Sequence, residues 1–133
     1  MTGFKPIRYD SGKLDTKTLA ASQTITKGMA LVDSSGYLAE ADSAAVYVEY
    51  VAMEAKTSGS GEHPTIQVVK TNDVEFEAVC NSTITIAKEQ YMADLSNSKV
   101  VNESATSNNV FLIEHVIDAA NKIVTGRFIQ KVS

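Results

Sequence analysis

The sequence predicts an all-β fold, either a small β-sandwich or a β-barrel. Short segments rich in Val, Ile, Thr and Tyr recur along the chain, and Gly, Asn, Asp and Ser separate them. The length of 133 residues suits one globular domain and is short for two. A faint internal repeat further suggests that the fold is built from two related β units, with an extended N-terminal arm in front of them.

The first twenty residues, MTGFKPIRYDSGKLDTKTLA, differ from the rest because they show no regular hydrophobic period. We therefore predict an N-terminal arm over residues 1–20 and a single β domain over 21–133. An aperiodic segment with apolar side chains gains order by lying on something else, which can be its own sheet, a neighbouring subunit or another protein. The candidate contact residues of this arm are Phe4, Pro6, Ile7, Arg8 and Tyr9.

The stretch KGMALVDSSGYLAEA, residues 27–41, predicts a β-hairpin because two apolar runs flank the turn residues DSSG. In this interpretation Asp33 caps the turn, while Gly28 and Gly36 serve backbone geometry. A calcium loop is a poor alternative, since oxygen ligands at regular spacing and a closing glutamate are missing.

A second hairpin is predicted from TIQVVK (65–70), the loop TND (71–73) and VEFEAV (74–79). The last segment alternates apolar and acidic residues, so Glu75 and Glu77 are expected on its solvent face. The Asn and Asp of the loop tolerate the positive φ of a tight turn.

Two further segments allow alternatives. Residues 46–53, VYVEYVAM, fit a helical stripe, but their β-branched side chains favour a strand. Residues 114–124, EHVIDAANKIV, contain DAANK, which fits either a turn between strands or a short helix, and we predict the turn. Loops are expected over 56–64 and 102–109, which are rich in Gly, Ser or Asn.

The internal repeat joins two pairs of segments. Residues 24–36 align with 85–97 at an offset of 61, and 46–51 align with 111–116 at an offset of 65. We therefore predict related units over 22–51 and 83–116. Two such units packed together would cover sheet edges that are otherwise exposed.

Composition argues against several classes of function. A net charge of −4, with the basic residues scattered, argues against nucleic acid as a partner. No apolar run approaches the roughly 20 residues of a membrane helix, and the N-terminus lacks the apolar core of a secretory signal. We therefore expect a protein that is made in a cytoplasm and has neither membrane nor nucleic acid as a partner.

Candidate chemistry is sparse. Cys80 is the only cysteine and is expected to be a small buried hydrophobe. His63 lies in a Gly-Ser loop and His115 on a predicted strand, and neither has a second ligand at metal spacing. A Cys80–His115 nucleophile pair has no flanking signature. We predict no metal, no cofactor and no enzymatic activity.

Several segments in a fixed order carry a family resemblance: the arm MTGFKPIRYDSGK, ITKGMALV (25–32), DSSG (33–36), YLAEA (37–41) and VYVEYVA (46–52). Over roughly residues 1–55 the chain resembles the small capsid decoration (head cement) proteins of tailed bacteriophages. Family members commonly carry Gly-Val-Ala where this chain has Tyr50-Val51-Ala52. This departure leaves another phage structural subunit, for head completion or the tail tube, as an alternative.

The resemblance implies a structural protein without catalysis. It would bind the major capsid protein on the outside of the virion, as a homo-oligomer for which a trimer is favoured and a dimer is the alternative. The N-terminal arm, with Phe4, Ile7 and Tyr9, would contact the capsid, for example by adding a strand to one of its sheets. Two other classes compete: a small carbohydrate-binding β module, which the absence of Trp disfavours, and a small β-barrel enzyme.

Overall fold

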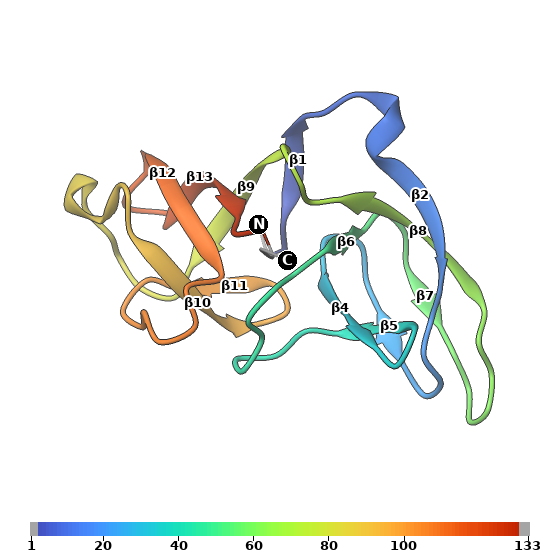
Figure 1. Cartoon of the computed structure of the whole chain (residues 1–133). Coiled ribbons are helices and arrows are strands. Elements are labelled where there is room, and N and C mark those ends of the chain that lie inside the picture. Colours follow the sequence, from blue (N-terminus) through green and yellow to red (C-terminus); the bar gives the residue numbers. More distant parts are fainter. Residues whose placement is uncertain (1–2, 131–133) are drawn as a thin grey trace.

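The computed structural model describes residues 3–130 and contains two lobes of β-strands that lie side by side. In Figure 1 the N-terminal lobe, β2 to β8, is on the right in blue to green, and the C-terminal lobe, β9 to β13, is on the left in yellow to red. Strand β1 runs between the two lobes. The predicted all-β fold is confirmed, and each lobe is a ring of five strands.

The elements have the following bounds. The strands are β1 (Lys5–Arg8), β2 (Leu14–Thr18), β3 (Thr24–Ile25), β4 (Ala30–Ser34), β5 (Tyr37–Glu40), β6 (Tyr50–Ala52), β7 (Lys56–Thr57), β8 (Thr65–Lys70), β9 (Glu75–Cys80), β10 (Met92–Asn97), β11 (Val100–Asn102), β12 (Phe111–Asp118) and β13 (Ile123–Phe128). Two short 3-10 helices are η1 (Ser11–Lys13) and η2 (Ile86–Lys88).

The C-terminal lobe is a closed five-stranded barrel. Its strands follow the order β9-β11-β10-β12-β13, and β13 pairs back with β9. The β9–β11 pair is parallel and the other pairs are antiparallel. Closure leaves the barrel without a free edge, except where β1 adds to the first half of β9.

The N-terminal lobe repeats this arrangement, but its first and last strands, β2 and β5, are joined by fewer contacts. Its strands follow the order β2-β8-β6-β4-β5, and β3 and β7 form a separate two-stranded sheet. A parallel bridge between Leu19 and Leu38 joins the end of β2 to β5. The Ala20 amide donates to the Leu38 carbonyl at 2.8 Å beside this bridge.

The two rings have the same connectivity. Strands β2, β5, β4, β6 and β8 stand where β9, β11, β10, β12 and β13 stand in the other lobe, and the parallel contact falls at the same place in both. The equivalence covers about 14–70 and 75–128, which is wider than the predicted units over 22–51 and 83–116. That the units descend from a duplication stays a prediction.

The pairing also revises the first offset of the repeat, which joins the two hairpins. The β4–β5 turn lies at 35–36 and the β10–β11 turn at 98–99, an offset of 63 rather than 61. A shift of two residues keeps every side chain on the same face of its strand. The sequence alignment therefore matched the correct hairpins with the wrong register.

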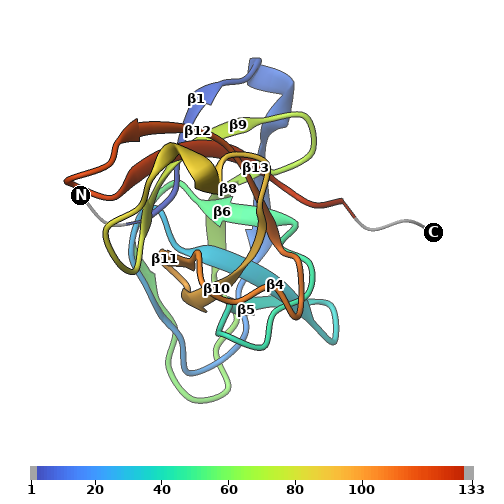
Figure 2. The ribbon, with the colours of Figure 1, turned by 90° about the vertical axis from the view of Figure 1, so that its left-hand side faces the viewer.

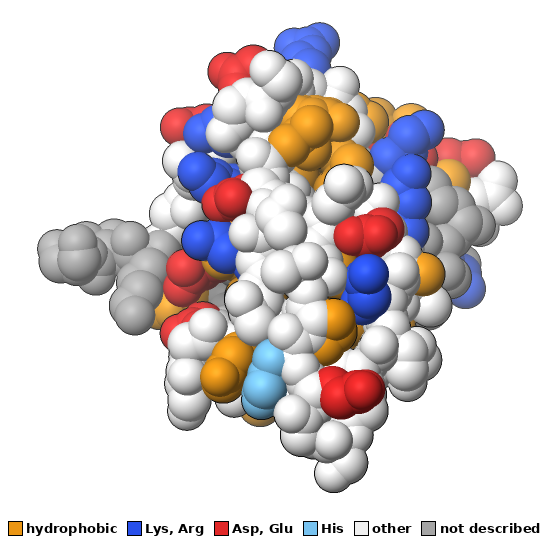
Figure 3. All heavy atoms as spheres, turned by 90° about the vertical axis from the view of Figure 1, so that its right-hand side faces the viewer, with side chains coloured by type: hydrophobic (Ala, Val, Ile, Leu, Met, Phe, Trp, Pro, Cys, Tyr) orange, Lys and Arg blue, Asp and Glu red, His pale blue; other side chains and the backbone are white. Residues whose placement is uncertain are grey.

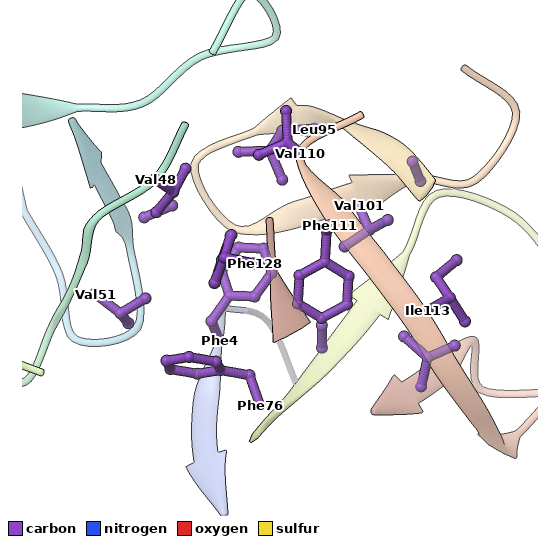
Figure 4. Packing of buried hydrophobic residues seen from close by; sticks show 14 of the residues in the cluster. Phe4, Val48, Val51, Phe76, Leu95, Val101, Val110, Phe111, Ile113 and Phe128 are labelled. Atoms are coloured by element: carbon purple, nitrogen blue, oxygen red, sulfur yellow. The ribbon is translucent and has the colours of Figure 1, made fainter. Parts of the chain in front are cut away.

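The larger core joins the lobes. It fills the C-terminal barrel and continues to the outer face of the other lobe, where Val48 and Val51 contribute. Four phenylalanine rings form its centre, and Figure 4 shows them between Val51 on one side and Ile113 on the other. The second core fills the N-terminal lobe and includes Ala52, because successive residues of β6 point to opposite faces.

The hairpin over residues 27–41 is confirmed as β4–β5. Ser34 pairs with Tyr37, and the two turn residues both have positive φ, 55° at Ser35 and 91° at Gly36, as a type I′ turn requires. The Asp33 carboxylate accepts from the Gly36 amide at 3.1 Å. Gly28, at φ 94°, lets the chain approach Gly3 closely, because a Cβ there would lie 3.3 Å from the Gly3 Cα.

The predicted hairpin over 65–79 is wrong. Its two strands exist as β8 and β9, but β8 pairs with β2 and β6, whereas β9 belongs to the other lobe. The segment between them is therefore the crossing between lobes, and the Thr71 hydroxyl anchors it by donating to the Val48 carbonyl at 2.7 Å. Positive φ at Asp73 and burial of the apolar side of β9 are as predicted.

The two ambiguous segments are now assigned. In 46–53 only Tyr50–Ala52 is a strand, and no helix forms. In 114–124 a turn over 119–122 joins β12 to β13, which confirms the predicted turn. Asp118 stabilises this turn by accepting from the Asn121 amide at 3.2 Å.

Candidate functional site

The N-terminal segment lies on the sheets of its own chain. Strand β1 pairs with β9, and β2 pairs with β8 along its whole length. Basic residues of β1 face acidic residues of β9, with Lys5 opposite Glu77 and Arg8 opposite Glu75. The arm was expected to lie on its own sheet, on a neighbouring subunit or on another protein, and the structure shows it on its own sheets. Residues 3–20 therefore do not form an arm apart from the body.

Phe4 was predicted to contact a partner, and this prediction is wrong because Phe4 is a core residue. Its side chain is 2% exposed, and its ring centroid lies 4.8 Å from that of Phe128 and 5.6 Å from that of Phe111. Its amide donates to the Gly28 carbonyl at 2.8 Å, which ties the segment to the other lobe. Phe4 is therefore part of the core and not of the exposed side of the arm.

Strand β1 is also a poor template for strand addition. One edge is hydrogen-bonded to β9, and the half-buried Pro6 has no N–H to offer on the other. Donation of an added strand by the arm, which the resemblance implies, therefore does not fit this arrangement.

The other arm residues remain at the surface. Ile7 is 39% exposed and Tyr9 is 41% exposed, and Arg8 lies between them. Leu14, 46% exposed, follows after the single turn of η1. We call Ile7, Arg8, Tyr9 and Leu14 the arm surface. In Figure 3 hydrophobic side chains gather near the top of the face shown, the end at which η1 lies in Figure 1.

The prediction missed Leu14 as a surface residue. Its side chain lies on the opposite face of β2 from Asp15, and both Leu14 and Thr16 on this outward face are exposed. The alternation over LDTKT is visible in the sequence, but the apolar residue falls on the outward side, which pattern reading assigns to polar residues.

A second apolar surface lies on the C-terminal lobe, which Figure 2 turns toward the viewer. It consists of Ile86, Tyr91, Met92 and Ile117, and Ile86 is the most exposed of them at 74%. We call this the η2 surface. Backbone contacts hold its segment along β12, including the Gln90 amide donating to the Ile113 carbonyl at 2.6 Å. Nothing in the pattern of 83–92 predicted this surface.

A shallow cavity of about 220 Å³ opens beside β1 at the junction of the lobes. It is lined by Phe4, Pro6 and Met53, with Lys5 and Lys27 among its other residues. The walls are mostly apolar and carry no acid–base pair. A cavity of this kind can hold a side chain or a small apolar group.

The candidate nucleophile is not activated. Cys80 is 3% exposed, and burial, with Glu103 nearby, raises the pKa of its thiol to about 12. A thiol with this pKa supplies almost no thiolate at neutral pH. The prediction that Cys80 behaves as a small buried hydrophobe is confirmed.

The histidines occupy separate surface positions. His63 stacks on Tyr37 with ring centroids 4.0 Å apart, and its Nδ1 lies 3.1 Å from the Leu19 carbonyl oxygen. His115 lies opposite Thr125 on the C-terminal barrel. Within residues 3–130 no group of three or more His, Cys, Asp or Glu side chains could hold a metal ion.

Comparison with known proteins gives no relative: no family model matches the chain, and no curated protein does. The family resemblance therefore rests on the motifs of residues 1–55 alone. Among the described helices none is long and apolar enough to cross a membrane.

Proposed function

We propose that this protein is a non-enzymatic structural protein that binds the outer surface of a phage capsid and stabilises the mature head. The motif order over residues 1–55 supports this proposal, and so does a body built from two compact β-rings. The observation that carries it is the arm surface, where Ile7, Tyr9 and Leu14 are exposed on or next to the strands β1 and β2, which pair with β9 and β8. Apolar side chains held in this way favour contact with another protein.

The arm surface suits binding as a preformed patch. Because Phe4 anchors β1 in the core and β9 pairs with it, little conformational entropy is lost when a partner covers Ile7 and Tyr9. Each contact would be modest, and many copies on a lattice would together resist expansion of the capsid. The partner in this proposal is the major capsid protein.

The test is co-sedimentation with expanded, undecorated capsids. The double variant Ile7→Ser/Tyr9→Ser removes two of the three apolar side chains of the arm surface without touching the core, and we expect it to lose most of the saturable binding. The matched control is Ile86→Ser/Ile117→Ser on the η2 surface, which removes two exposed apolar side chains from the other lobe and should bind as the wild type does.

A folded Ile7→Ser/Tyr9→Ser variant that still saturates capsids at wild-type concentrations would contradict the role of the arm surface. Deletion of residues 1–13 is a poorer test, because it also removes Phe4 from the core. Loss of binding in that variant would not distinguish a missing contact from an unfolded body.

A further inference from the structure

Strands β9 and β2 occupy equivalent places in the two lobes, but one edge of β9 is covered by β1 and the equivalent edge of β2 is open. The parallel contacts pair Leu19 with Leu38 and Cys80 with Val101, so Leu19 corresponds to Cys80. By the same offset, the stretch of β9 that β1 covers, which begins at Glu75, corresponds to the start of β2. Among residues 3–130 no strand lies on that part of β2.

The backbone groups of the open edge can be assigned from the ladder. The Leu19 amide donates to the Pro64 carbonyl at 2.8 Å on the β8 side. Alternate residues of an antiparallel strand direct their amide and carbonyl groups to the same neighbour. Asp15 and Lys17 therefore bond toward β8, whereas Leu14 and Thr16 direct their backbone groups to the open edge.

A side chain, not a strand, occupies this edge. The Thr16 amide donates to the Asp15 carboxylate at 2.8 Å, and this hydrogen bond is the main reason that the pKa of Asp15 is lowered. The same carboxylate lies 3.6 Å from Lys17 Nζ, and both side chains are partly exposed. A carboxylate can rotate away from an amide, so this cap is reversible in a way that a paired strand is not.

The comparable outer edges are closed differently. On β1, Pro6 lacks an N–H, as described above. On β5, the Leu38 carbonyl accepts from the Ala20 amide. The next outward amide, that of Glu40, donates to the side-chain oxygen of Gln23 at 3.0 Å. At the edge of β2, by contrast, the Leu14 amide donates to the Ser11 carbonyl and the Thr16 amide to the Asp15 carboxylate, which are both local contacts.

We propose that this edge pairs with the same edge of a second copy of the chain, antiparallel about a two-fold axis at Thr16. In that register Thr16 faces Thr16 of the partner subunit, and Asp15 faces Lys17 of the partner subunit. The segment is thus complementary to itself in charge, and Thr–Thr and opposite-charge pairs both favour antiparallel pairing. The Thr16 amide exchanges the Asp15 carboxylate for the partner's carbonyl.

This contact closes after two copies, because a two-fold axis uses the same patch on both. Among the oligomers that the family resemblance implies, it favours the dimer over the trimer. Figure 3 views the molecule from the side on which β2 lies in Figure 1, and basic and acidic side chains lie side by side on this face. The inference goes beyond the proposed function, since it requires no capsid.

Sedimentation of the whole chain over a range of concentrations tests the contact. We expect the wild-type mass to rise from that of the 14.3 kDa chain toward twice that value. The variants D15K and K17D each place like charges opposite one another, so each alone should remain monomeric. An equimolar mixture restores both opposite-charge pairs and should form a heterodimer.

Glu114 and Arg127 provide the control. They form a surface pair at 3.2 Å between β12 and β13, and the variants E114K and R127E change charge by the same amounts as D15K and K17D. These variants should associate as the wild type does, singly and mixed. A wild type that stays monomeric, β2 variants that self-associate as the wild type does, or a mixture without heterodimer would each overturn the proposal.

Hydrogen exchange on the wild type gives a second test that does not depend on the variants folding. Exchange at the Thr16 amide should slow as protein concentration rises. The Gly36 amide is the matched control, because it also donates to an aspartate in an exposed position. Equal exchange at Thr16 across concentrations would contradict pairing through β2.

Discussion

Phe4 shows how one side chain decides the role of the segment around it. In sequence it looks like its apolar neighbours Ile7 and Tyr9, and all three were predicted as partner contacts. In the structure Phe4 alone turns inward, where Phe76, Phe111 and Phe128 leave room for a fourth ring. Sequence could not separate these roles, because the complementary space is formed by residues more than 70 positions away.

This difference predicts unequal costs of truncation. Phe4→Ala should lower the free energy of unfolding by about 3–5 kcal/mol, because it leaves a cavity among packed rings. Ile7→Ala, on the exposed side of the same segment, should change it by less than about 1 kcal/mol. Urea unfolding of both variants measures the contrast, and similar small costs would show that Phe4 is not part of the core.

At the scale of elements, local pattern predicted strands better than their partners. The hairpin over 27–41 was predicted correctly because its turn chemistry and its pairing are both local. Strands β8 and β9 were also located correctly, but their pairing was not, since nothing within 65–79 records that the chain passes between lobes there. The arm surface was found in part, and the η2 surface was missed because exposed apolar residues have no periodic signal.

Closure of the C-terminal barrel depends on a close approach between β12 and β13. Gly126 lies against β12, and a Cβ there would collide with the Leu112 carbonyl oxygen and the Phe111 ring. Gly126→Ala should therefore destabilise the protein by more than about 2 kcal/mol, because the backbone of two strands must shift.

The control for this prediction is Gly36→Ala in the β4–β5 turn. That position has positive φ but open space around it, so its cost should be only about 1 kcal/mol. Thermal unfolding of the two variants ranks them. A Gly36→Ala variant less stable than Gly126→Ala would contradict the account of barrel closure.

At the scale of the whole molecule, two rings of like connectivity share one core and present two apolar surfaces, the arm surface along β1 and the start of β2 and the η2 surface on the C-terminal lobe. The repeat could be detected from the sequence, but its true register and extent could not, because strand pairing and not residue identity carries the equivalence. The arrangement leaves the arm surface exposed beside strands that are paired with the body. That is the property on which the proposed function depends.

Quantitative mass spectrometry of purified virions tests the central proposal most directly. The account predicts that the protein copurifies with mature heads in a copy number comparable to that of the major capsid subunit, since stabilisation of a lattice requires a contact at each repeat. Absence from virions, or only the few copies expected of a head-completion component at a single vertex, would contradict it.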